Sequence, residues 1–262
     1  MSSILDAIAV DKRKHISRQR KRVSEQSLLD TCKQGHDIRD FVAALSARTS
    51  NNQTAIIAEV KKASPSRGVI RADFDPLAIA LSYQQTGATC LSVLTDMPYF
   101  QGSDRYLEDI SHKVRIPVLR KDFMLDPYQV LEAKALGADA ILIILAMVDD
   151  ELAADLCAAA REHKLAILPE VHNLNELNRA LRLDTHLLGI NNRDLHTFQT
   201  SLETSLNLLP YIPEDRIVIT ESGIQTRFDI EKMQAANIYG FLVGESLIRQ
   251  PDPGLALAKL LS

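Results

Sequence analysis

Short runs of apolar, mostly β-branched residues recur along this chain and limit its fold more than any other feature. There are eight such runs, each with the length and composition of a buried strand. They begin near Thr54, Thr89, Pro117, Ala138, Leu165, Leu187, Arg216 and Tyr239. The segments between them have helical periodicity. The chain therefore alternates strand with helix, which is the pattern of a parallel sheet covered by helices.

Helix-boundary residues agree with this alternation. Asp75-Pro76 and Asp126-Pro127 each place an N-cap residue before a proline at the first helical position, and Gly87 and Gly137 lie where helices should end. Eight strand–helix units fit a closed barrel better than an open doubly wound sheet, whose usual GxGxxG motif is absent. We therefore predict the α/β class: a single (β/α)8 TIM barrel over residues 51–262, with an N-terminal helical extension over residues 1–50.

Charge and cysteine content narrow the classes of function. The net charge of −4 argues against nucleic acid as a partner but leaves room for a local basic pocket that binds a small anion. The three cysteines have no CxxC spacing and the seven histidines have no HxxxH or HxH spacing, so we expect no disulfide framework and no metal site. The N-terminus resembles neither a signal peptide nor a membrane span, so cytoplasm is the expected location.

Two polar segments outside the strands have two interpretations each. The basic run from Lys12 to Arg22 is expected to be a solvated helix face, with a ligand-binding patch as the alternative. The turn-rich loop at residues 63–68 is either a lid or a simple connection.

Ionisable residues follow the predicted strands at their carboxyl ends, where barrel enzymes carry their active sites. The two-residue period of a strand puts Glu59 and Lys61 on the same face as Ile57, so all three point into the barrel if Ile57 does. The same spacing brings more charges to the mouth. The predicted cluster comprises Glu59, Lys61, Lys121, Glu170 and Glu221. Such a cluster is typical of acid–base catalysis, although an ion-pair network that only plugs the barrel is the alternative.

Small residues end the last two strands, in Glu221-Ser222-Gly223 and Gly244-Glu245-Ser246. They let backbone N–H groups and a following helix N-terminus approach an anion, so a phosphorylated substrate is predicted. The side chain of Glu245 is expected to turn away from the phosphate.

Other residues near strand ends are less informative. Phe74, Phe100 and Phe123 either wall an aromatic ligand or pack in the core. His172 is interpreted as a satisfied loop histidine.

With these residues in view, the chain resembles the indole-3-glycerol phosphate synthase family from end to end. The matching segments are ILDAIAVDKR, IAEVKKASPSRGVI, LSVLTD followed by YFQGS, VLRKDFMLDPYQV, PEVHN, GINNRDL, ITESGI and GFLVGESLIR. The resemblance implies a barrel lyase that closes the indole ring of 1-(2-carboxyphenylamino)-1-deoxyribulose 5-phosphate with loss of CO₂ and water, without metal or organic cofactor.

The resemblance also implies roles for individual residues. Lys121 is similar to the general acid, Glu170 to a general base, and Glu59 with Lys61 to the pair used in dehydration. Asn191 matches a residue at the sugar hydroxyls, supported by Glu221 and Arg193, and Lys61 with Ser64 matches contacts to the substrate carboxylate. The implied substrate-binding residues are Ser64 at the carboxylate, Phe100 and Phe123 at the aromatic ring, Arg193, Leu242, and Ser222, Gly223, Gly244 and Glu245 at the phosphate.

Some positions depart from the family pattern. Pro169 directly precedes Glu170, removes a backbone donor from its strand, and could re-aim that carboxylate. Arg67 stands where lysine is common, which should matter little.

Two alternatives to the synthase remain. One is a barrel like phosphoribosylanthranilate isomerase, which uses a Cys and an Asp at strand ends, whereas here Lys61 follows the first strand. The other is a non-catalytic phosphate-binding barrel. The expected partner is a small phosphorylated substrate, with no nucleic acid and no membrane, and the chain is expected to be a monomer or a weak homodimer.

Overall fold

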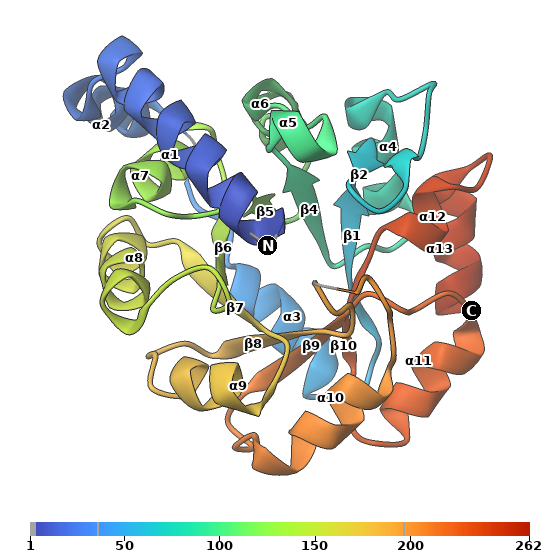
Figure 1. Cartoon of the computed structure of the whole chain (residues 1–262). Coiled ribbons are helices and arrows are strands. Elements are labelled where there is room, and N and C mark those ends of the chain that lie inside the picture. The colour runs from blue at the N-terminus through green and yellow to red at the C-terminus, as the bar shows by residue number, and fades with distance from the viewer. Residues whose placement is uncertain (1–3, 36, 196) are drawn as a thin grey trace.

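The predicted barrel is present in the computed structural model, which describes residues 4–35, 37–195 and 197–262. In these segments eight parallel strands close in the order β1-β10-β9-β8-β7-β6-β5-β4 (Figure 1). They are β1 (Ala55–Val60), β4 (Cys90–Leu94), β5 (Val118–Lys121), β6 (Ala140–Ile144), β7 (Ala166–Val171), β8 (Leu187–Asn191), β9 (Ile217–Glu221) and β10 (Gly240–Val243). Each falls within one of the eight apolar runs, so the strand prediction is confirmed.

Helices form the outer ring. They are α4 (Pro76–Gln85), α5 (Met97–Phe100), α6 (Asp104–Ser111), α7 (Pro127–Ala135), α8 (Asp150–Glu162), α9 (Leu174–Ala180), α10 (Glu203–Leu208), α11 (Arg227–Gln234), α12 (Glu245–Ile248) and α13 (Pro253–Leu261), with a 3₁₀ turn at Leu209–Tyr211. Asp75 and Asp126 cap α4 and α7 through their carboxylates, as their spacing predicts. Gly87 and Gly137 follow those helices with φ of 105° and 87°, a conformation that glycine adopts without strain.

The last helix of the N-terminal extension covers the amino end of the barrel. The extension consists of α1 (Ile4–Arg22), α2 (Glu25–Gln34) and α3 (Phe41–Thr49). Phe41 and Leu45 of α3 are fully covered and pack against the inward residues at the start of the strands, such as Ala55 and Leu187. The first turns of α1 lie at the opposite end, over the carboxyl ends of the strands (Figure 1). The extension therefore borders both openings of the barrel.

The barrel interior is built from alternate residues of the strands. Ile57, Leu119, Leu168 and Ile219 belong to one buried inner cluster. Two residues further along their strands stand Glu59, Lys121, Glu170 and Glu221, which line the pocket at the mouth. These side chains therefore point into the barrel, as the two-residue period predicts. The apolar layer inside the barrel is followed directly by the charged layer at its mouth.

The expectation of a fully solvated basic face is wrong at Lys12. Its side chain is buried, and its Nζ lies 2.8 Å from Asp96 Oδ1 and 2.6 Å from Asp122 Oδ1. Burial lowers the pKa of Lys12, but the two carboxylates outweigh burial, so the pKa is raised. Most of the remaining basic residues in this run are exposed, as predicted.

Among the described residues, no helix combines the length and hydrophobicity needed to span a membrane.

Candidate active site

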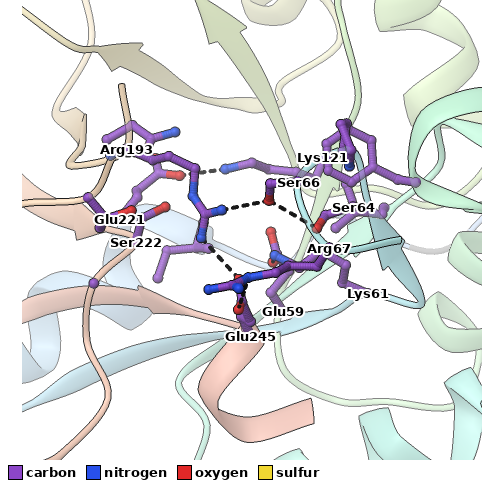
Figure 2. Close-up of a pocket in the computed structure, with 18 of the residues that line it drawn as sticks. Glu59, Lys61, Ser64, Ser66, Arg67, Lys121, Arg193, Glu221, Ser222 and Glu245 are labelled. Atoms are coloured by element: carbon purple, nitrogen blue, oxygen red, sulfur yellow. Dashed lines mark hydrogen bonds and ion pairs between the residues drawn. The ribbon is translucent and has the colours of Figure 1, made fainter. Parts of the chain in front are cut away.

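A cavity of about 680 Å³ opens at the carboxyl ends of the strands, and it contains the predicted charged cluster (Figure 2). Its size suits a small organic ligand. The predicted residues that line it are Glu59, Lys61, Ser64, Phe100, Lys121, Phe123, Glu170, Asn191, Arg193, Glu221, Ser222, Gly223, Leu242, Gly244 and Glu245. The structure therefore brings together every site residue expected from the sequence.

Lys121 lies between two buried carboxylates. Its Nζ is 3.2 Å from Glu170 Oε2 and 2.5 Å from Glu221 Oε2. Lys61 forms a separate pair with Glu59 on the first strand (Figure 2). The mouth thus holds one group of Lys121, Glu170 and Glu221 and one pair of Lys61 and Glu59, and proton transfer within each needs no large movement.

Burial and the neighbouring charges shift the pKa values of Lys121, Glu170 and Glu221 in different directions. Burial lowers the pKa of Lys121, but Glu221, Glu170 and Glu59 more than offset it, so the pKa is raised. Burial opposes ionisation of Glu170, yet Lys121 and His172 hold its pKa below the usual range. Burial raises the pKa of Glu221, and the charge on Glu170 adds to this against the pull of Lys121. The result is an ammonium, an ionised carboxylate and a carboxyl group that retains its proton more readily.

Two glycines make room for these carboxylates. A Cβ at Gly189 in the middle of β8 would collide with Glu221 Oε1, and a Cβ at Gly244 would collide with the side chain of Glu59. Gly244 is among the residues expected at the site, whereas Gly189 is not. Its signal in the sequence is a glycine within an otherwise apolar strand, which marks a close approach.

Glu170 points into the pocket and is bonded to a side chain of the neighbouring strand β8. Asn191 Nδ2 donates to Glu170 Oε1 over 3.1 Å. Pro169 pairs with Ile143 of β6 while Glu170 points into the pocket, so the proline does not re-aim the carboxylate.

His172 is more than a loop histidine with its bonds satisfied. Its Nδ1 lies 3.0 Å from Glu176 Oε2, and its Nε2 lies 3.4 Å from Glu170 Oε1 without forming a hydrogen bond. Burial lowers the pKa of His172, but Glu170 and Glu176 prevail and raise it to about 10. The imidazolium therefore supports the charge on Glu170 from outside the pocket.

One end of the cavity is apolar and aromatic. The rings of Phe100 and Phe123 have centroids 6.0 Å apart and are tilted by 46°. Leu242 and the α1 residues Ile4, Leu5 and Ile8 complete this wall. Phe74 packs against Tyr106 instead, so among the three phenylalanines it has the packing role.

The opposite end is polar and is lined by arginine and serine side chains. Arg193 Nη1 donates to Ser66 Oγ over 2.8 Å, and Ser66 belongs to the hairpin of β2 (Ala63–Ser64) and β3 (Gly68–Val69) (Figure 2). The loop after β1 is therefore a wall of the pocket rather than a plain connection. Ser222 and Gly223 have positive φ of 62° and 92°, which turns the chain sharply after β9.

The side chain of Glu245 does not turn away, contrary to the sequence-based expectation. It is 18% exposed and pairs with Arg193, Arg67 and Arg249. The three guanidinium groups hold it inside the wall. The helix that it begins, α12, has four residues, so the dipole expected at this position is small.

No metal site is found among the described residues, because no group of three or more His, Cys, Asp or Glu side chains there is arranged to hold an ion. That the chemistry needs no metal and no organic cofactor stays a prediction.

Comparison with known proteins decides the family. A family model described as indole-3-glycerol phosphate synthase matches residues 5–260. The chain belongs to the indole-3-glycerol phosphate synthase family. The resemblance drawn from the sequence motifs is thereby confirmed.

Relatives of this synthase-family chain agree in length and fold. An indole-3-glycerol phosphate synthase of Leptothrix cholodnii (strain ATCC 51168 / LMG 8142 / SP-6) is 52% identical over 262 residues and covers 100% of both chains. The solved structure of KGPDC from Streptococcus mutans has a TM-score of 0.62 at 10% identity, covering 79% of this chain and 95% of its own. The native KDPGal structure has a TM-score of 0.55 at 18% identity, covering 79% and 90%. These two structures share the fold.

Some pocket residues of this synthase-family member were not anticipated. Arg249 comes from the end of α12, and Ile4, Leu5 and Ile8 come from α1. None of these four residues lies at the end of a barrel strand, so a search of strand ends misses them. Apolar residues spaced along the first helix are the available signal, but they do not show which opening the helix covers.

Proposed function

We propose that this chain is an indole-3-glycerol phosphate synthase, which converts 1-(2-carboxyphenylamino)-1-deoxy-D-ribulose 5-phosphate into indole-3-glycerol phosphate, CO₂ and water in tryptophan biosynthesis. The observation that carries the proposal is Lys121 held between Glu170 and Glu221 at the barrel mouth of a chain that matches the family throughout.

The two ends of the cavity suit the two ends of this substrate. The carboxyphenyl ring fits the apolar wall of Phe100, Phe123 and Leu242, and the phosphate fits the polar wall of Arg193, Ser222 and Gly223. Holding both ends brings the ring carbon close to the ketone in one bound conformer. Such orientation lowers the activation barrier by several kcal/mol. The lower end of the known range is about 7 kcal/mol.

The first step forms the new carbon–carbon bond. The ring carbon that bears the carboxylate attacks the ketone carbon, and Lys121 transfers a proton to the ketone oxygen as negative charge develops there. A positioned acid of this kind contributes about 10²- to 10⁴-fold. Glu170 stabilises the cation formed on the ring system, while Asn191 holds the hydroxyl region of the sugar chain. Loss of CO₂ then returns its bonding electrons to the ring.

The second step removes water. The hydroxyl group made in the first step leaves with a proton, and a base takes the hydrogen on the neighbouring carbon, which completes the indole. Lys61 and Glu59, paired on the first strand, are the proposed groups. Ser64 lies beside them and is proposed to bind the carboxylate before it is lost.

The isomerase alternative gains no support from the cysteines. Cys32 lies in α2, Cys90 at the start of β4 and Cys157 in α8, so none stands at the carboxyl end of a strand. All three are free thiols, which suits a reducing compartment, and we propose the cytoplasm as the location. The proposed working form is a monomer or a weak homodimer.

The test combines turnover with the removal of the proposed acid. The purified chain is mixed with the substrate in a chelating buffer, and indole fluorescence is followed. We expect a rising signal for the wild type and a fall in kcat of at least about 10²-fold for Lys121→Ala, because the variant has no donor at the ketone oxygen. Calorimetry should show that the variant still binds substrate.

A matched control is Lys113→Ala, which removes an exposed lysine remote from the pocket and should turn over like the wild type. Turnover by Lys121→Ala close to that of the wild type would show that another group is the acid. Absence of both binding and turnover in the wild type would refute the function itself.

A further inference from the structure

Three arginines converge on one carboxylate at the polar end of the cavity. Arg193 Nη2 lies 3.0 Å from Glu245 Oε2, while Arg67 Nε and Arg249 Nη2 each lie 3.2 Å from Glu245 Oε1. The arginines come from separate parts of the chain: the hairpin after β1, the loop after β8 and the end of α12. Figure 2 shows Arg67 and Arg193 reaching Glu245 from two sides of the pocket.

This cluster lies within the wall expected to bind phosphate. Glu245 follows Gly244 directly, and both line the cavity together with Ser222 and Gly223. Arg193 is also anchored by Ser66, so its guanidinium group is held in place independently of Glu245. The charges of the arginines keep the pKa of Glu245 below its usual value against the effect of burial, so the residue is an anion near neutral pH.

A phosphate group and this carboxylate compete for the same donors. Guanidinium groups bind phosphate oxygens in the same forked geometry that they use for carboxylates. The three guanidinium groups carry three positive charges, and the carboxylate cancels one of them, so less charge is left for a phosphate dianion while Glu245 stays in place. A dianion beside a fixed carboxylate would also be repelled by it, since like charges a few ångströms apart interact strongly at a half-buried site.

We propose that Glu245 is an internal competitor for the phosphate subsite: its carboxylate gathers Arg67, Arg193 and Arg249 and leaves them when the substrate phosphate binds. The inference rests on the proposed function for the identity of the phosphate-bearing substrate. Glu245 then acts as a specificity residue. A ligand group with one negative charge binds the arginines little better than the carboxylate that it must replace.

Inorganic phosphate is the probe for the test, because its binding can be measured without turnover. Calorimetry would compare the wild type with Glu245→Gln, which keeps the size of the side chain and removes its charge. We expect Glu245→Gln to bind phosphate at least tenfold more tightly and to show a lower KM for the substrate. Glu245→Asp, whose shorter carboxylate reaches fewer arginines, should fall between them.

Glu203→Gln is the matched control, since Glu203 is an exposed carboxylate paired with Lys232 at 2.7 Å on α10. It should bind phosphate as the wild type does. Unchanged or weaker phosphate binding in a folded Glu245→Gln protein, checked by thermal unfolding, would overturn the proposal and assign Glu245 the role of ordering the arginines. Failure of wild-type turnover in the indole assay would instead refute the proposed function.

Discussion

His172 connects a carboxylate inside the pocket with one outside it. The imidazole lies between Glu170 and Glu176, and the raised pKa of about 10 keeps it protonated across the neutral range. Glu176 in turn accepts from the backbone N–H of His172 over 2.8 Å, which fixes the ring beside the end of β7. The charge of Glu170 therefore depends on Lys121 and on a residue that the substrate does not need to touch.

His172→Gln tests this dependence. Without the imidazolium, the pKa of Glu170 should rise, so the acidic limb of the pH profile of kcat/KM should move to higher pH. The pairing should also stabilise the wild type fully below pH 6.5, the ordinary pKa of histidine, and this advantage should be lost as the pH rises towards about 10. Urea unfolding at several pH values measures the difference.

The control for that experiment is His163→Gln, at the end of α8 and away from the pocket. Its activity profile should match that of the wild type. An unshifted acidic limb in His172→Gln would show that Lys121 and Asn191 hold the charge on Glu170 unaided.

At the scale of elements, α1 is attached to the barrel by a buried ionic network. Lys12 joins Asp96, which caps α5, to Asp122, which follows Lys121 directly. Asp122 also accepts from Thr95 Oγ1 over 2.7 Å and lies 3.3 Å from Arg120 Nη2. The first helix is therefore linked to the strand end that presents the proposed acid.

Lys12→Met should loosen this attachment. Two buried carboxylates would lose their shared cation, which costs about 3–5 kcal/mol in the free energy of unfolding. KM should rise because Ile4, Leu5 and Ile8 of the same helix line the aromatic end of the pocket. Urea unfolding and steady-state kinetics measure the two effects.

Lys14→Met, on the exposed side of α1, is the comparison, because its ion pair with Asp11 is largely solvated. Its stability and KM should remain close to wild type. If Lys12→Met also leaves stability and KM unchanged, the ionic network is not what attaches α1 to the barrel.

At the scale of the whole molecule, a second buried ionic network lies at the amino end of the barrel, away from the pocket. At the amino end, Arg39 Nε donates to Asp139 Oδ2 over 2.8 Å, and the same carboxylate accepts from the backbone of Val118 over 2.7 Å. Arg39 also donates to the carbonyls of Ser111 and Val114. These bonds join the approach to α3 with β5 and β6, at the end opposite the pocket.

Asp139→Asn should therefore lower stability while sparing the chemistry. Replacing a fully buried charge paired with an arginine costs about 3–5 kcal/mol in the free energy of unfolding. Under conditions in which the Asp139→Asn variant stays folded, its kcat and KM should stay near those of the wild type. Asp109→Asn, at an exposed pair with Arg105, supplies the surface comparison. A large fall in kcat for folded Asp139→Asn would show that the network at the amino end also supports the chemistry.

The part of the site that lies on strands could be predicted because strand geometry is simple. Ile57 in the interior determines that Glu59 faces the mouth, and the same count carries Leu119 to Lys121. Lys12 and Glu245 could not be placed in this way. Lys12 is paired with Asp96 and Asp122, and Glu245 with Arg67 and Arg193, all of which are distant from it in sequence. A pattern within one segment contains no information on such partners.

The pairing of β1 with β10 has a consequence for how the protein is made. Ala55 lies opposite Gly240, so the first barrel strand has one open edge until the last strand has left the ribosome. Contacts between such distant segments form slowly, and an uncovered strand edge can recruit other nascent chains. During synthesis, this edge of β1 therefore stays uncovered until residues 240–243 emerge and close the ring.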